Sequence, residues 1–497
     1  MASSHFLDIR SWINNLPPIT LWTTNTESLC ICSGGSTSPS MNLLITKIPR
    51  NQIVRVIFSI YVEFRIPISL WSSNSFDFKS DARQNLDEIG IDLFLNLVNG
   101  VLKYDACKKE SSPRFSKLKE EEFANIFNLA FLTLNFLVCI YEAPQDIRRG
   151  CLDALRLQLM APRAREASKL LMKALGSNLE EKWMRTLNLA ITNQMVELRD
   201  SKHSFKTPSP LFSYALSTIG LWKVQCYCPV IAMKMENISS RVADERLSFS
   251  LNNQQLEAVI QLAYRVNYSK NWMDVLVTID NIRCDVNPLV PQTLLNERGY
   301  GCEEKHFPSR ISLQLTPTLQ NEILSVSVTK SSENQTREVE IEKSLEASFD
   351  PPNSYMSITA SASESVTISI KPWKFEQSVF GSTANFNWFL HDGVNGREVS
   401  SSKPSKLALL QPKAWFRDRY SSAYRPFTKQ GGVIFARDEY GEGLRWRICQ
   451  SEIGKNMEFE IIGQIWLTYW PNKQRTFHSE TKKLEFKELL YLSLAEA

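Results

Sequence analysis

The spacing of apolar residues changes once along this chain, and that change limits the folds open to it. From residue 82 to about residue 205, apolar residues recur at intervals of three and four, which places them on one face of a helix. After the segment SFKTPSPL at 204–211, apolar and polar residues alternate, as in a strand with one buried face. The sequence therefore predicts helices first and β-sheets afterwards.

Local signals divide the helical part into five segments. Pro144 opens one helix, Gly176 closes another, and Ser177 with Glu180 has the spacing of a capping box. The second segment, FANIFNLAFLTLNFLVCIY at 123–141, carries no charge and has nearly the length of about 20 residues that a membrane span needs. Three asparagines and a threonine interrupt it, so we expect the central helix of a soluble bundle and no membrane span.

Residues 206–497 read as short strands without intervening helices, which is typical of antiparallel sheets. They are too many for one sandwich of about 100 residues. The predicted fold class is therefore an α+β multidomain protein, with a helical bundle followed by two antiparallel β-sandwich-like domains. The expected domains are an N-terminal segment with a β-hairpin at 1–81, the helical bundle at 82–205, a first β-domain at 206–300 and a second β-sandwich domain at 301–497. The N-terminal segment is expected to dock on a neighbouring domain, with the edge of a β-domain preferred to the bundle.

Charge and cysteine usage suggest a compartment but no general partner. A net charge of +4 over 497 residues gives no overall attraction to nucleic acid or membranes, so a basic patch must be local. The ten cysteines are scattered, and the first residues do not resemble a secretory signal, which favours reduced thiols. We expect a cytoplasmic or nuclear protein, and import into an organelle is the open alternative.

No local pattern of residues predicts catalysis or metal binding. The five histidines, at 6, 203, 306, 391 and 478, have no nucleophile motif beside them. Cys30-x-Cys32 and Cys226-x-Cys228 are one residue shorter than the usual zinc-binding pair. Asp274 and Asp280 suggest the solvated face of a strand more than a calcium site. We therefore predict no catalytic residue, no metal and no cofactor, and favour a non-catalytic protein over an enzyme.

The segment from 411 to 447 is the most distinctive in the chain. Alternation assigns Val433, Phe435, Leu444, Trp446 and Ile448 to a buried face, with ARDEYGEGLRW at 436–446 as a hairpin. Alternation does not explain WFRDRYSSAYRPF at 415–427, which has the arginine-rich and aromatic composition of a binding loop. The predicted partner-binding residues are Trp415, Arg417, Arg419, Tyr420, Tyr424 and Arg425. The alternative is that the aromatic residues only anchor the loop to its own domain.

Two stretches, WINNLPPI at 12–19 and LAYRVNYSKNWMDVLVT at 262–278, resemble uncharacterised plant proteins of unknown function. The resemblance covers most of the chain and implies no activity. The expected function is a non-catalytic scaffold or adaptor that binds a protein partner through the 415–427 loop. Two alternatives stay open: a hydrolase acting on a glycan or lipid at a site assembled between domains, and a nucleic-acid binding protein.

Overall fold

The computed structural model divides the chain into two compact units. The first contains residues 1–214 with 289–291, and the second contains residues 215–288 with 292–497. The structure describes residues 7–33, 39–50, 53–79, 89–106, 119–199, 212–238, 244–300, 303–328, 337–344, 363–370, 373–390, 432–436, 443–471, 476 and 478–494.

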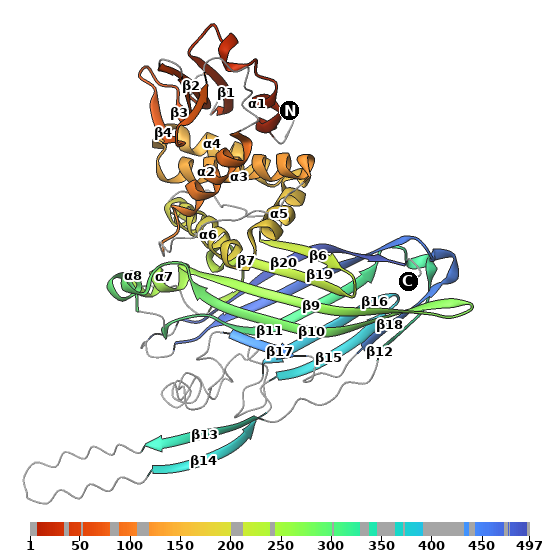
Figure 1. Ribbon diagram of the computed structural model, residues 1–497. Helices are drawn as coiled ribbons and strands as arrows, with labels where there is room; N and C mark the ends of the chain where they lie inside the picture. Colours follow the sequence, from red (N-terminus) through yellow and green to blue (C-terminus); the bar gives the residue numbers. More distant parts are fainter. Residues whose placement is uncertain are drawn as a thin grey trace, which may run out of the picture. The chain divides into compact units, whose positions relative to one another are not determined.

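The first unit opens with a short helix and an antiparallel sheet (Figure 1). These elements are α1 (Ile9–Asn14), β1 (Thr26–Ser33), β2 (Ser40–Arg50), β3 (Ile53–Val62), β4 (Ile68–Ser72) and β5 (Phe76–Lys79). The strand order is β1-β2-β3-β4, and β5 also pairs with β3. In β3 the residues from Val54 to Val62 alternate between buried and half-buried, so one face of the sheet supplies a core.

Five helices follow the sheet in the same unit. They are α2 (Gly90–Leu102), α3 (Glu120–Tyr141), α4 (Gln145–Leu159), α5 (Pro162–Leu175) and α6 (Ser177–Arg199). Every residue of α3 from Ile126 to Ile140 is buried, which gives it the expected central position. In the part of the chain that the structure describes, α3 is the one helix long and apolar enough to cross a membrane, and 83% of its most apolar window is buried inside the structure. The absence of a membrane span stays a prediction.

A buried asparagine ties α1 to the central helix. Asn128 on α3 accepts a hydrogen bond from the Arg10 backbone N–H at 2.9 Å and donates one to the Asp8 carboxylate at 3.0 Å. Asp8 also caps α1 by accepting from the Ser11 N–H at 3.0 Å. Asn128 therefore satisfies a backbone donor that the first turn of α1 leaves without a partner in the helix.

We expect Asn128→Ala to lower the free energy of unfolding of the first unit by about 1–3 kcal/mol, because it leaves the buried Arg10 N–H unpaired. Asn125 lies one turn earlier on α3 and accepts from Arg163 at the surface. Asn125→Ala should change stability by no more than about 0.5 kcal/mol. Chemical denaturation of the two variants checks the difference, and equal losses would show that the tether contributes nothing.

The second unit contains two large antiparallel sheets (Figure 1). The seven-stranded sheet has the order β12-β18-β10-β9-β7-β6, with β17 also paired to β10. Its strands are β6 (Ser213–Thr218), β7 (Leu221–Pro229), β9 (Gln254–Tyr268), β10 (Trp272–Pro288), β12 (Ile323–Val328), β17 (Gly432–Ala436) and β18 (Gly443–Cys449). The six-stranded sheet has the order β15-β16-β11-β19-β20-β8. Its strands are β8 (Lys234–Ile238), β11 (Phe307–Pro317), β15 (Trp373–Phe380), β16 (Thr383–Leu390), β19 (Asn456–Tyr469) and β20 (Glu480–Ser493).

Smaller elements complete this unit. They are the helices α7 (Glu245–Asn252) and α8 (Gln292–Arg298) and the two-stranded sheet of β13 (Arg337–Ser344) and β14 (Ser363–Ile370).

Aromatic side chains join the two large sheets of the second unit. The ring of Phe459 on β19 lies 5.1 Å from Trp222 on β7 and 5.3 Å from Trp446 on β18. Phe435 on β17 lies 5.9 Å from Trp388 on β16. All five side chains are buried, so the inner faces of the two sheets share one core.

The predicted fold class is wrong in its order and in its β-domains. A five-stranded sheet precedes the helices, where the sequence predicted only a hairpin. That sheet belongs to the helical unit, and the Cys151 thiol of α4 donates to the Cys32 carbonyl of β1, so the preferred docking on a β-domain edge is also wrong. The two expected sandwiches form one unit, because β10 pairs with β18 and β8 pairs with β20.

The prediction of a hairpin at 436–446 is also wrong, because its two strands pair with a third strand. Both β17 and β18 pair with β10, at successive positions along it: β17 with Asn281–Asp285 and β18 with Trp272–Thr278. Alternation correctly predicted the burial of Phe435, Leu444, Trp446 and Ile448. It could not identify the partner strand, because alternation only reports which face of a strand is buried.

Candidate functional site

The residues predicted to bind a partner lie outside the described part of the chain. Trp415, Arg417, Arg419, Tyr420, Tyr424 and Arg425 all fall between residues 391 and 431, and His391 falls there too. The described strands on either side of this segment are β16, which ends at Leu390, and β17, which begins at Gly432. These strands belong to different sheets of the second unit.

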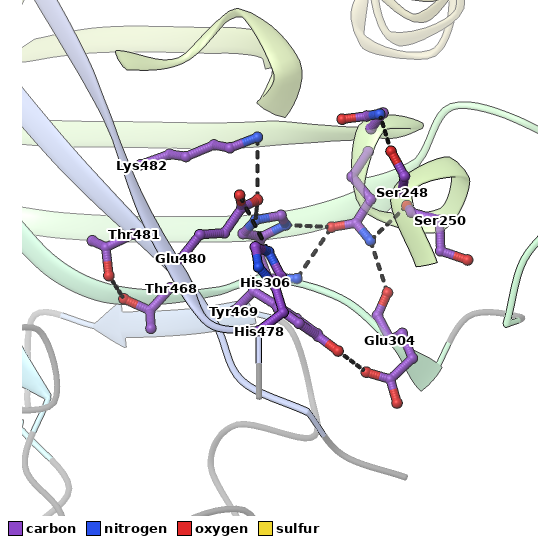
Figure 2. A network of polar contacts seen from close by, with 12 residues as sticks. Ser248, Ser250, Glu304, His306, Thr468, Tyr469, His478, Glu480, Thr481 and Lys482 are labelled. Carbon is purple, nitrogen blue, oxygen red and sulfur yellow. Dashed lines mark hydrogen bonds and ion pairs between the residues drawn. The ribbon is translucent and has the colours of Figure 1, made fainter. Parts of the chain in front are cut away.

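Among the described residues, catalytic residue types gather in one buried polar cluster, drawn in Figure 2. We call it the His306 cluster. Its members are Gln254, Glu304, His306, Tyr469, His478, Glu480 and Lys482, each no more than 6% exposed. The fold brings them together from four segments. Gln254 begins β9 directly after α7, Glu304 and His306 precede β11, Tyr469 ends β19, and the others lie just before β20 (His478) and at its start (Glu480 and Lys482).

Gln254 determines the orientation of the histidine. Its amide nitrogen donates to the backbone carbonyls of Ser250 and Glu304, both at 2.9 Å. Its amide oxygen accepts from the His306 backbone N–H at 3.1 Å and lies 2.9 Å from His306 Nδ1. Turning the amide over would lose these bonds, so Nδ1 must carry a proton and donate to Gln254.

A proton must also lie between the second ring nitrogen of His306, Nε2, and the Glu480 side chain. Nε2 lies 2.9 Å from Glu480 Oε1, a distance at which two lone pairs would repel each other. Since Nδ1 already donates to Gln254, the pair must be an imidazolium with a carboxylate or its proton-transferred equivalent. Burial lowers the pKa of His306 and opposes the imidazolium, with the Glu480 hydrogen bond acting against that effect. We assign the protonation state of His306 from its hydrogen bonds, because Gln254 can present only its amide oxygen to Nδ1.

Glu480 is the acceptor at the centre of the cluster. Besides His306, the ammonium of Lys482 lies 3.2 Å from Oε1, and His478 Nε2 lies 3.5 Å from Oε2. Burial by itself would raise the pKa of Glu480. The hydrogen bond to His306, the nearby His478 and the charge of Lys482 together outweigh burial, and the pKa falls below its ordinary value.

Tyr469 connects the histidines to the remaining carboxyl group. Its ring lies 5.9 Å from the His306 ring and 5.8 Å from the His478 ring. Its hydroxyl donates to Glu304 Oε2 at 2.6 Å. Figure 2 shows this ring between the Glu304 side and the Glu480 side of the cluster. The cluster is thus a continuous network that holds α7, β9, β11, β19 and β20 together at one end of the sheets.

The contacts of His306 suit a structural role better than a catalytic one. A histidine that activates a nucleophile needs one nitrogen directed at a hydroxyl or thiol and access for a substrate. Both nitrogens of His306 are occupied, by Gln254 and by Glu480, and its side chain is 0% exposed. The arrangement therefore does not favour the hydrolase alternative at this histidine.

The sequence contained a signal for part of this cluster. His478, Glu480 and Lys482 alternate in phase with Leu484 and Phe486, which are buried on the inner face of β20. Three polar residues on the buried face of a strand indicate a buried polar network, since such groups need partners. In the sequence, His306 and His478 stand out only as histidines without a nucleophile motif beside them, and Gln254 and Glu480 were missed.

Among the described residues, no group of three His, Cys, Asp or Glu side chains could hold a metal ion together. The prediction of no metal stays a prediction, since Cys302 lies outside them.

The assignment of Asp274 to a solvated face is wrong. Its side chain is 6% exposed and pairs with Arg445 and Arg447 of β18. The hydrogen bond from Arg445 contributes most to lowering the pKa of Asp274, and the one from Arg447 adds to the effect.

Comparison with known proteins gives no family for this chain. Neither the known protein families nor the curated proteins match it. Among solved structures, Clostridium perfringens delta-toxin is 10% identical with a TM-score of 0.21, over 56% of this chain and 99% of the toxin. The Clostridium perfringens NetB toxin in its membrane-inserted form is 8% identical with a TM-score of 0.20, over 56% of this chain and 98% of that one. TM-scores this low carry no argument about the function of this chain.

Proposed function

We propose that this protein is a non-catalytic scaffold or adaptor that binds a protein partner through residues 415–427. The observation that carries the proposal is the position of this segment between β16 and β17. These strands lie in different sheets of one core, so the described structure holds both ends of the chain that contains the segment. Recognition residues are commonly carried on segments that a rigid scaffold positions in this way.

The burial at both ends supports this role. Leu390, the last residue of β16, is 3% exposed, and Phe435 of β17 is 2% exposed and lies 5.2 Å from Trp373 of β15. The described strands on either side of the segment are therefore packed in the core. Arginine and tyrosine are enriched among the residues that dominate binding energy, and the segment contains Arg417, Arg419, Tyr420, Tyr424 and Arg425.

The test removes Arg417, Arg419 and Arg425 together. We expect the alanine triple variant to melt within a few degrees of the wild type, because surface substitutions change stability by about 0.5 kcal/mol. Its recovery of protein partners from extracts of the expressing tissue should fall at least several-fold, since hot-spot side chains cost more than about 1 kcal/mol each when truncated. Quantitative pull-down and thermal melting measure the two effects.

A matched variant controls for the loss of charge. Arg246, Arg265 and Lys270 are exposed residues of the same unit, and replacing all three by alanine removes the same charge. This control should recover partners as the wild type does. A 415–427 variant that melts normally and recovers every partner contradicts the proposal, and one that unfolds supports structural anchoring. If the wild type recovers partners from an untreated extract but not from a nuclease-treated one, the result would indicate nucleic acid as the partner.

A further inference from the structure

Four cysteines of the first unit lie together where β1 meets α4. Cys30 and Cys32 are on β1, Cys139 is near the end of α3, and Cys151 is on α4. Each is close enough to Cys151 to interact with it electrostatically. All four are free thiols, and they differ in access to solvent: Cys30 is exposed and the other three are buried.

Within this group, Cys32 and Cys151 are in direct contact. The Cys151 thiol donates to the Cys32 carbonyl oxygen, with the Sγ atom 3.9 Å from it. The two thiols also interact electrostatically. The chain therefore places these two cysteines next to each other, one on β1 and one on α4.

These contacts give the two thiols different reactivity. The side-chain interaction with Cys32, followed by that with the Met41 backbone, lowers the pKa of Cys151 despite its burial. The same side-chain interaction, together with burial, raises the pKa of Cys32. Burial also raises the pKa of Cys139 to about 12. Cys151 is thus the member that forms a thiolate most readily, and the thiolate is the form that reacts with oxidants.

We propose that Cys32 and Cys151 form a reversible disulfide that links β1 to α4 when the protein meets a peroxide. The Cys151 thiolate attacks one peroxide oxygen, which forms a sulfenic acid and releases hydroxide. The Cys32 thiol then attacks the Cys151 sulfur, which forms the S–S bond and releases water. Two thiols lose two electrons, hydrogen peroxide becomes two waters, and a small thiol reverses the reaction by disulfide exchange.

Simple packing is the competing explanation, because buried cysteines often serve as small apolar residues. The second unit provides the comparison. Cys226 on β7 and Cys284 on β10 are both 0% exposed, and each pairs in register with Ala258 on the strand between them. A whole strand therefore separates these two thiols, which makes them a matched pair that is equally buried but not in contact.

The experiment treats the purified full-length chain with a small excess of hydrogen peroxide. Free thiols are counted after denaturation, and peptides are mapped by mass spectrometry. We expect two thiols to be lost, a linked peptide that joins residues 32 and 151, and return of both thiols with dithiothreitol. The melting transition of the first unit should rise by several degrees in the oxidised protein, because the link closes a loop of more than 100 residues.

Substitutions identify the pair. Cys32→Ser and Cys151→Ser should each abolish the link, whereas Cys30→Ser should retain it. If the serine variants fail to fold, the linked peptide of the wild type still decides the question. The proposal is overturned by a link between any other two cysteines, by oxidation of Cys151 to a sulfinic acid without a link, or by loss of Cys226 and Cys284 at the same rate as Cys32 and Cys151.

Discussion

Replacing Glu480 with glutamine is expected to lower the free energy of unfolding of the second unit by about 3–5 kcal/mol, the usual cost of removing one partner from a buried ion pair. The substitution leaves the Lys482 ammonium, 3% exposed, without the carboxylate that lies 3.2 Å away. It also removes the negative charge that stabilises the His306 imidazolium, because the glutamine amide keeps only one neutral oxygen as an acceptor for Nε2. Chemical denaturation followed by tryptophan fluorescence measures the loss.

Glu485 provides a matched control on the same strand. Its side chain is 50% exposed and pairs with Lys483 at 2.7 Å. Glu485→Gln should cost less than about 1 kcal/mol, because exposed ion pairs are screened by water and salt. A similar loss in both variants would mean that the His306 cluster adds no stability beyond an ordinary surface pair.

The effect of Glu480 should also depend on pH in one direction. The pKa of this carboxyl is lower in the folded protein than in the unfolded chain, where it is about 4.5. Its stabilising contribution is therefore complete above that pH and is lost as the pH falls toward the folded pKa. The difference between the wild type and Glu480→Gln should narrow below pH 4.5 by about 1.4 kcal/mol per pH unit. A difference that stays constant from pH 6 to pH 3 would contradict this assignment.

The second large effect is expected at Gly463 in β19. A Cβ atom at this position would lie 1.9 Å from Phe486 Cζ, and Phe486 is directly opposite on β20 and 1% exposed. The ring cannot move toward solvent, so Gly463→Ala forces atoms into a filled core. We expect a loss of about 1–3 kcal/mol, the usual cost of overpacking.

Removing the Phe486 ring should restore part of the stability that Gly463→Ala loses. Phe486→Leu by itself should also destabilise the protein, because it leaves a space over Gly463. The double variant should lose less stability than the sum of the two single variants, with a coupling of about 0.5–3 kcal/mol. Additive losses in a double-mutant cycle would show that the alanine acts through the backbone and not through Phe486.

The helices of the first unit were predictable because their signals are local. Pro162 and Gly176, which has φ +72°, bound α5, and the next helix begins at Ser177 as the capping spacing indicates. The N-terminal sheet was largely missed because its outer strands give weak signals. The strand β1 (TESLCICS) is mostly polar or exposed along its first half, and β4 and β5 have only five and four residues.

The candidate site was less predictable than the strands that build it. The inward phase of β18 followed from alternation, because one buried face is a property of a single strand. The contacts of His306 join residues 52 and 174 positions away, Gln254 and Glu480. Such contacts depend on which strands pair, and a single sequence does not encode strand pairing in a pattern that can be read locally.

The pairing of β8 with β20 has a consequence for how the protein is made. Residues 234–238 pair with residues 480–483, so the first strand waits for a partner that is synthesised about 240 residues later. At roughly 5–20 residues per second, the ribosome needs on the order of 10–50 seconds to add the residues between them. During that interval the partly built sheets expose apolar strands, and unpaired edges of this kind invite association with other chains. The second unit is therefore the part of the nascent protein that most needs a chaperone, whereas the first unit can complete its fold before most of the second unit has been synthesised.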